Sequence, residues 1–126
     1  MIALMTISST GIAGASGYER VTEGVELRLL RYHADRGTTF FVRMRKGARA
    51  PRHGHPGGEE TCVLAGTLRI EARLDSDGAA QPDLVLSAGE YAFAPAGETH
   101  EGVALEDTVF FVVAAGGIAA ARLNGP

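Results

Sequence analysis

The sequence has little of several features that define large classes of protein. Its 126 residues include a single cysteine, which excludes both a disulfide framework and a zinc cluster built on several thiolates. That residue, Cys62, stands within an apolar run, as expected of a buried and unreactive thiol. The residue patterns typical of Ser/His/Asp or Cys/His nucleophilic enzymes are missing as well. Nucleophilic catalysis of these two types is therefore not expected.

Long apolar runs and excess positive charge are also missing. No run is long enough to cross a bilayer. The apolar start of the chain, residues 1–4, lacks the basic residues and the sustained apolar segment of a signal peptide. The net charge of −3 gives no general attraction to nucleic acid. We therefore expect a cytoplasmic protein that binds neither membranes nor nucleic acid.

Glycine and proline are plentiful, at 17 and 5 residues, and they divide the chain into short segments. Between them, period-two alternation and β-branched or aromatic residues predict strands. The predicted strands cover residues 25–33, 38–44, 61–64, 67–74, 83–86, 91–94 and 108–113. No long amphipathic helix and no internal repeat interrupts them. About seven to nine short strands separated by turns predict one all-β sandwich or barrel.

The strand at residues 67–74 alternates most regularly. This alternation predicts that Leu68, Ile70, Ala72 and Leu74 face the core. It predicts that Arg69, Glu71 and Arg73 face solvent.

The barrel is expected to span residues 22–113. Residues 1–21 are predicted to form a flexible arm, because they are small and rich in Ser and Gly. The alternation of Ile2, Leu4 and Thr6 also allows this arm to pair as a strand with a second subunit. Residues 114–126 form a tail, in which residues 119–123 could make a short helical turn.

Two of the four histidines, His53 and His55, stand one residue apart. On an extended segment they point to the same side, and a turn through residues 56–58 brings Glu59 to that side too. Two imidazoles and a carboxylate make a metal site with open positions. Glu60 is expected on the opposite face, exposed or ion-paired, and would be the ligand only under a different motif spacing. His33 is expected to be a solvated histidine.

These residues lie in two motifs that resemble those of the cupin superfamily. The first resembles the pattern G(x5)HxH(x3)E(x6)G, carried here by Gly47, His53, His55, Glu59 and Gly66. The second resembles G(x5)PxG(x2)H(x3)N, carried here by Gly89, Pro95, Gly97 and His100, with Ala104 in place of the Asn. The run of residues 53–66 further resembles the ChrR-type branch, which includes the zinc-binding C-terminal domain of some anti-sigma factors.

The resemblance implies a cupin-type jelly-roll barrel, or double-stranded β-helix, which is commonly a homodimer. It implies that one divalent metal ion is held by His53, His55, Glu59 and His100. Iron, zinc, manganese and nickel all accept imidazole and carboxylate ligands, and iron or zinc is favoured here. Four protein ligands leave two positions open on a six-coordinate ion, whereas they could close a tetrahedral zinc site.

Other residues are candidates for contact with a small-molecule substrate. Arg43 and Arg45 share a strand face and could recruit an anionic substrate, although a solvated strand edge is the alternative. Tyr91 and Phe93 are candidates for a pocket wall, with the core as the alternative. Glu98 and Glu101 flank His100 and could orient its imidazole; exposed loop carboxylates are the favoured expectation for both.

Two functions agree with this reading. The first is a metal-dependent dioxygenase acting on a small enolisable or phenolic substrate, with Glu59 released from the metal to act as a catalytic base. The alternative is a zinc-binding sensor or regulatory module without catalysis, which the ChrR-type resemblance favours. A complete anti-sigma role is not expected, because residues 1–21 contain neither the His nor the Cys of a sigma-binding domain.

Overall fold

Strands and turns make up the part of the protein that the computed structural model describes, residues 16–116. Its strands are β1 (Glu19–Thr22), β2 (Val25–Tyr32), β3 (Thr38–Met44), β4 (Arg49–Gly54), β5 (Glu59–Ala65), β6 (Thr67–Leu74), β7 (Ala80–Gln81), β8 (Leu84–Ser87), β9 (Tyr91–Ala94), β10 (Thr99–Ala104) and β11 (Thr108–Ala114). Within residues 16–116 no helix could span a membrane.

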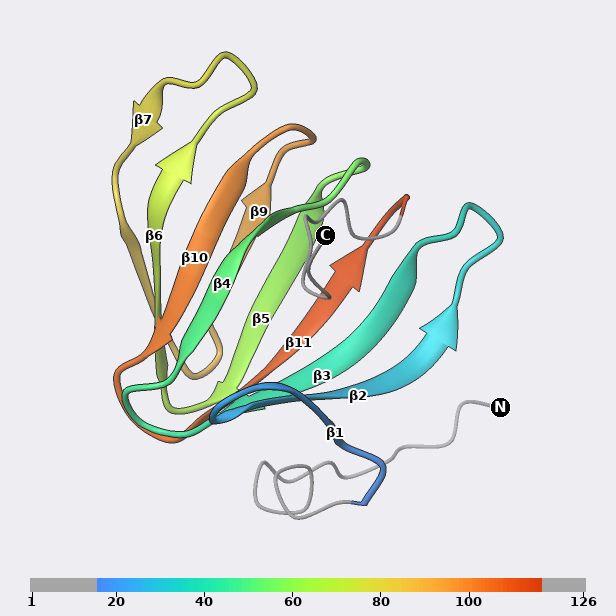
Figure 1. The fold of residues 1–126 in the computed structure, drawn as a ribbon, viewed down its shortest axis with the longest axis vertical. Helices are drawn as coiled ribbons and strands as arrows, with labels where there is room; N and C mark the ends of the chain where they lie inside the picture. Colours follow the sequence, from blue (N-terminus) through green and yellow to red (C-terminus); the bar gives the residue numbers. More distant parts are fainter. Residues whose placement is uncertain (1–15, 117–126) are drawn as a thin grey trace.

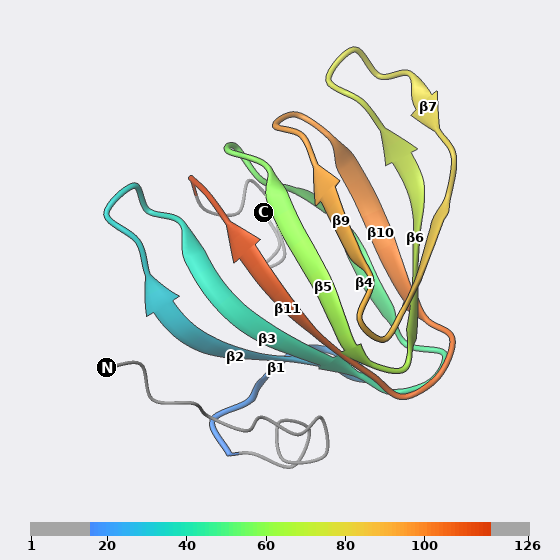
Figure 2. The same cartoon turned by 180° about the vertical axis from the view of Figure 1, so that it is seen from behind.

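The strands form two antiparallel sheets. One has the order β1-β2-β3-β11-β5-β9, and the other has the order β4-β10-β6-β7 with β8 also paired to β6. The strands fan out across the molecule, from β6 and β10, which run steeply, to β3 and β2, which slope more gently (Figures 1 and 2). Neighbours such as β11 and β5 are distant in sequence, as in a jelly roll. The predicted all-β jelly-roll fold is confirmed.

The core lies between the sheets and follows the period-two pattern of the strands. Phe40, Val42 and Val112 from the six-stranded sheet pack in one cluster with Leu68 and Ile70 from the other sheet. A second, smaller cluster gathers alternate residues of the first sheet, with Phe41 and Val109 buried and Tyr18, Leu64 and Phe111 packed on them. Adjacent phenylalanines in β3 and β11 thus belong to different clusters, as alternation requires.

Strand β1 overlaps the predicted N-terminal arm. Residues 19–21 of that arm belong to β1, which pairs with β2 of the same chain, Glu19 opposite Leu27. Residues 1–15 and 117–126, with the predicted inter-subunit strand at residues 2–6 and the helical turn at residues 119–123, lie outside the described residues. At the other end, β11 continues one residue past the predicted boundary, to Ala114.

The regular alternation predicted for β6 breaks at Ala72. Leu74 pairs with Thr99 and Glu71 pairs with Glu101, so two residues of β6 oppose one residue of β10. Ala72, at the bulge, has φ 51°, in the left-handed region.

Such a bulge reverses which residues face inward beyond it. Leu68 and Ile70 before the bulge are buried, as predicted. Ala72 is exposed, whereas the side chain of Arg73 is only 13% exposed. The prediction that Ala72 faces the core and Arg73 faces solvent is therefore wrong, because an alternation pattern in sequence does not reveal an inserted residue.

Candidate metal centre

The side chains of the first motif reach one site from both sheets. His53 lies near the end of β4, and its Cα partner on the neighbouring strand β10 is His100. Glu59 is the first residue of β5, in the other sheet. A turn closed by a hydrogen bond from the Gly58 amide to the His55 carbonyl, 3.1 Å long, joins β4 to β5. Gly58 has φ 88°, which suits glycine.

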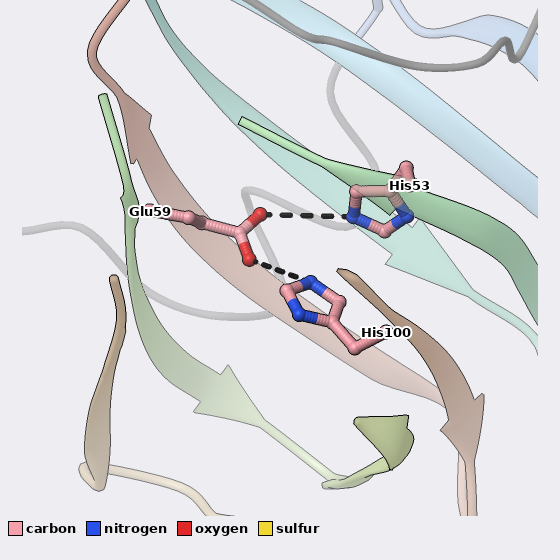
Figure 3. A group of neighbouring side chains, drawn as sticks. All are labelled: His53, Glu59 and His100. Carbon is pink, nitrogen blue, oxygen red and sulfur yellow. Dashed lines mark ion pairs between the residues drawn. The ribbon is translucent and has the colours of Figure 1, made fainter. Parts of the chain in front are cut away.

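The carboxylate of Glu59 stands at the centre of the cluster. Its Oε1 lies 3.0 Å from His100 Nε2, and its Oε2 lies 2.9 Å from His55 Nε2 and 3.9 Å from His53 Nε2. Figure 3 shows the two oxygens directed toward the rings of His53 and His100. The side chains of Glu59, His55 and His100 are each less than 8% exposed. The carboxylate and three imidazoles therefore form one buried polar cluster.

Two imidazoles are oriented by partners outside the cluster. His53 Nδ1 lies 2.8 Å from the Pro51 carbonyl oxygen, and His100 Nδ1 lies 3.0 Å from Glu98 Oε2. A carbonyl or carboxylate oxygen only accepts hydrogen bonds, so each Nδ1 carries the proton and donates. In the neutral rings, both Nε2 lone pairs then face Glu59 and are available to a metal ion.

Burial and hydrogen bonding compete to set the charges in the cluster. Burial alone would raise the pKa of Glu59, but hydrogen bonds from His100, His53 and His55 hold that pKa well below its usual value. Burial alone would lower the pKa of His100, but its contacts with Glu59 and then Glu98 raise it. Glu59 is therefore ionised, and His100 readily carries a proton when no cation is bound.

The spacing of the donors fits a metal ion. His53, Glu59 and His100 each offer a ligand atom within 4.8 Å of the other two. Two ligands on one ion, each about 2.1 Å from it, stand about 3–4 Å apart, which matches the spacing from Glu59 to His100 and to His53. These three residues could hold an ion. His55 is not part of this closest group, although its Nε2 touches Glu59.

The cluster forms one wall of a cavity of about 70 Å³. The rest of the wall is mainly apolar and comes from both sheets. It includes Phe40, Val42, Leu68, Ile70, Phe110 and Val112. Glu101 is the other ionisable residue on the wall, and no lysine or arginine lines it.

The predicted substrate residues lie elsewhere. Arg43 pairs with Glu26 at 2.7 Å and stacks over the ring of Tyr18, while Arg45 is exposed in the turn after β3. Neither lines the cavity. Arg43 lies on the face of β3 opposite the core residues, and Arg45 lies beyond the end of the strand. The face predicted for them therefore does not open on the metal centre.

The aromatic candidates of β9 also face away from the cavity. Tyr91 is 56% exposed and Phe93 is 53% exposed, whereas Ala92 between them packs against the core. Tyr91 donates a hydrogen bond to Glu60 at 2.8 Å, so Glu60 is exposed and partnered as expected. Period-two alternation places Tyr91 and Phe93 together correctly but does not determine which face of β9 is inside.

Glu98 differs most from expectation. It was expected as an exposed loop carboxylate, yet it is 5% exposed and holds the Nδ1 of His100. Glu101 keeps partial exposure and pairs with Arg49 at 3.2 Å. The position of Glu98 two residues before His100 was the available signal. No comparable signal exists for its partner Arg73, because the bulge that turns Arg73 inward cannot be recognised in the sequence.

A family model described as the ChrR cupin-like domain matches residues 12–119. The chain belongs to the ChrR cupin-like family. A comparison with curated proteins finds no match. Membership in this family agrees with the jelly roll and with the His and Glu donors gathered between its sheets.

Solved structures show the same fold as this ChrR-like cupin. A chain in the structure of Rhodobacter sphaeroides SigE in complex with the anti-sigma ChrR is 23% identical, with TM-score 0.62, over 77% of this chain and 47% of that chain. An acetylacetone dioxygenase from Acinetobacter johnsonii is 19% identical, with TM-score 0.67, over 100% of this chain and 82% of its own. KdgF from Halomonas sp. is 24% identical, with TM-score 0.62, over 78% of this chain and 84% of its own. At these identities the similarity shows the fold, which hosts many functions.

Proposed function

We propose that this ChrR-like cupin is a metal-dependent dioxygenase that acts on a small enolisable or phenolic substrate. The observation that carries the proposal is a buried Glu59 carboxylate surrounded by three imidazoles on the wall of an apolar cavity. His53, Glu59 and His100 would hold the ion, and His55 would be its fourth ligand. Iron is the proposed ion, since its open positions would supply Lewis-acid and redox chemistry.

The protein's own groups would prepare the site. Pro51 and Glu98 fix the Nδ1 protons of His53 and His100, so both Nε2 atoms are presented to the ion. Glu59 contributes the negative charge. Its lowered pKa makes it a weak proton acceptor, so its proposed role as a catalytic base would require it first to leave its imidazole partners.

The cavity wall favours a substrate that carries no charge away from the ion. A second anionic group would need another cation beside it in so apolar a space, and no lysine or arginine lines the wall. The oxygen of a phenol or an enol could reach the ion, while apolar substituents would contact side chains such as Phe40 and Ile70. The basic residues Arg43 and Arg45 are therefore left out of the proposed binding site.

A zinc-binding sensor or regulatory module is the second candidate. The family match to the ChrR cupin-like domain favours it. Four donors could close a tetrahedral zinc site and leave no position for a substrate. A homodimer stays a prediction for either function, since the described residues belong to one chain.

Metal analysis and oxygen uptake distinguish the two functions. The untagged protein is purified without chelator, its metal content is measured, and a sample reconstituted with ferrous iron is tested for oxygen uptake on a panel of diketones and phenols. We expect iron binding and uptake with at least one substrate, both abolished in His100→Ala. Tightly bound zinc that iron does not replace, with no uptake, would exclude the dioxygenase and support the sensor.

A further inference from the structure

A buried ion pair reaches the metal centre from outside the donor set. Arg73 donates from Nη2 to Glu98 Oε1 at 3.0 Å and from Nε to Glu98 Oε2 at 3.2 Å. Glu98 Oε2 also accepts the hydrogen bond from His100 Nδ1, at 3.0 Å. The side chains of Arg73 and Glu98 are 13% and 5% exposed. The three residues form a continuous chain of charged hydrogen bonds that ends on a proposed ligand.

Arg73 is itself fixed at both ends of its guanidinium group. Besides the two bonds to Glu98, its Nη1 donates to the Pro82 carbonyl at 2.6 Å, in the connection between β7 and β8. A bidentate contact to a carboxylate restrains both position and orientation. Glu98 therefore has little freedom to turn away from His100, and the His100 ring has little freedom to rotate.

The backbone is distorted where Arg73 enters this chain of contacts. Ala72, its neighbour, has φ 51°, a left-handed conformation that is unfavourable for a residue with a Cβ. Without the bulge, the alternation of β6 would direct residue 73 to solvent along with Arg69 and Glu71. Strained residues of this kind persist where the surrounding structure holds them, often at functional sites.

We infer that Arg73 and Glu98 are positioning residues for His100, and that the bulge at Ala72 delivers Arg73 to Glu98. The inference rests on the proposed metal binding at His53, Glu59 and His100. Glu98 would keep the Nδ1 proton of His100 in place, so that the Nε2 lone pair points at the ion. Partners of this type commonly contribute 10- to 100-fold to metal affinity.

A purely structural role for the pair is the alternative. Arg73 links β6 to Pro82 and to the start of β10, so its loss would lower stability even without any effect on the metal centre. Removing one member would also leave the other buried and unpaired. The experiment must therefore separate metal affinity from stability.

The test compares three variants. Glu98→Gln removes the charge, and the double variant Arg73→Met/Glu98→Leu removes both partners together and avoids an unpaired buried charge. Glu71→Gln is the matched control, because Glu71 also pairs with arginines of the sheet, Arg49 and Arg69, but does not contact His100. Affinity for Zn²⁺ and Co²⁺ is measured by competition with a chelator, beside urea unfolding of the metal-free protein.

We expect a loss of metal affinity of about 10-fold in Glu98→Gln and about 10- to 100-fold in the double variant. The Co²⁺ absorption spectrum should shift in both. Glu71→Gln should bind within twofold of the wild type. Wild-type affinity and spectrum in the folded double variant would overturn the positioning role. Failure of the wild-type protein itself to bind either metal would instead overturn the proposed metal site.

Discussion

The imidazole of His100 lies between two carboxylates, with Glu59 at its Nε2 and Glu98 at its Nδ1, each 3.0 Å away. A protonated ring satisfies both, whereas a metal ion at Nε2 would replace the proton there. Proton and metal therefore compete for the same lone pair. The charge state of this one residue links folding, pH and metal binding.

The stability of the metal-free protein should reflect this arrangement. The pKa of Glu59 is lowered from 4.5, so its contribution is present above that value and is lost as pH falls through its folded-state pKa. The pKa of His100 is raised from 6.5, so its contribution is full below that value and is lost as pH rises through its folded-state pKa. Both contributions are complete between pH 4.5 and 6.5.

We therefore expect Glu59 and His100 to add most to the stability of the metal-free protein in the window between pH 4.5 and 6.5. Urea unfolding of the chelator-treated protein across pH measures it. In His100→Gln the loss of stability above the window should be smaller than in the wild type. If the free energy of unfolding of that variant falls with rising pH as steeply as in the wild type, another group is responsible for the loss.

Ala72 offers a second prediction at this scale. An alanine held at φ 51° pays a steric cost that glycine does not pay. Ala72→Gly should therefore leave the free energy of unfolding unchanged or raise it by up to about 1 kcal/mol.

The matched control is Ala80→Gly in β7, which is exposed like Ala72 but is not at positive φ. It should lose about 0.5–1 kcal/mol by urea unfolding, the usual cost of glycine in a strand. Equal losses in the two variants would contradict the strain assigned to Ala72.

At the scale of elements, two glycines of the motifs hold turns for different reasons. Gly66, between β5 and β6, has φ 84°, and Gly89, between β8 and β9, has φ 87°. A Cβ on Gly66 would overlap the Asp107 carbonyl oxygen, whereas a Cβ on Gly89 would meet nothing within 4 Å. The two positions share a backbone conformation and differ in the space around them.

Alanine substitutions should separate these two effects. Gly89→Ala should cost about 1–2 kcal/mol for the left-handed conformation alone. Gly66→Ala should cost about 1–3 kcal/mol more, because the backbone must also move apart. Urea midpoints at constant m-value measure both. Equal losses would mean that the turn at Gly66 relaxes freely.

The residue patterns of the strands also explain which strands could be predicted from the sequence. Strands with a clear period of two, such as β3 and β11, were predicted closely. Strands β4 and β10 (RAPRHG and THEGVA) were not, since they carry glycine, proline and the polar residues of the site in place of alternating apolar residues. These are the strands that hold His53 and His100. In these two strands, functional side chains occupy positions where alternating apolar residues would otherwise identify a strand.

The convergence of His53, Glu59 and His100 could be predicted because the two motifs resemble those of cupins, and that resemblance implies that both motifs contribute to one metal site. The inward turn of Arg73 could not, because it depends on pairing between β6 and β10. The exposure of Tyr91 and Phe93 could not either, because alternation fixes which residues share a face but leaves open which face is buried.

At the scale of the whole molecule, the donor set joins the two sheets. His53 and His100 belong to the five-stranded sheet, while Glu59 begins β5 of the six-stranded sheet. A bound ion would therefore connect the layers that must separate on unfolding. Metal binding to the native state alone stabilises it by mass action, by about 2.7 kcal/mol when free metal is 100 times Kd.

We expect Zn²⁺ or Co²⁺ to raise the unfolding temperature of the chelator-treated protein, with a shift that grows with the logarithm of metal concentration. His100→Ala should lose most of this shift, because the ion would then have lost its ligand from β10. His33→Ala is the control, since His33 bonds to Thr39 at 2.6 Å and belongs to no donor group; it should keep the full metal-dependent shift even if its basal stability falls. An equal shift in His100→Ala and in the wild type would place the stabilising ion at another site and remove His100 from the proposed ligands.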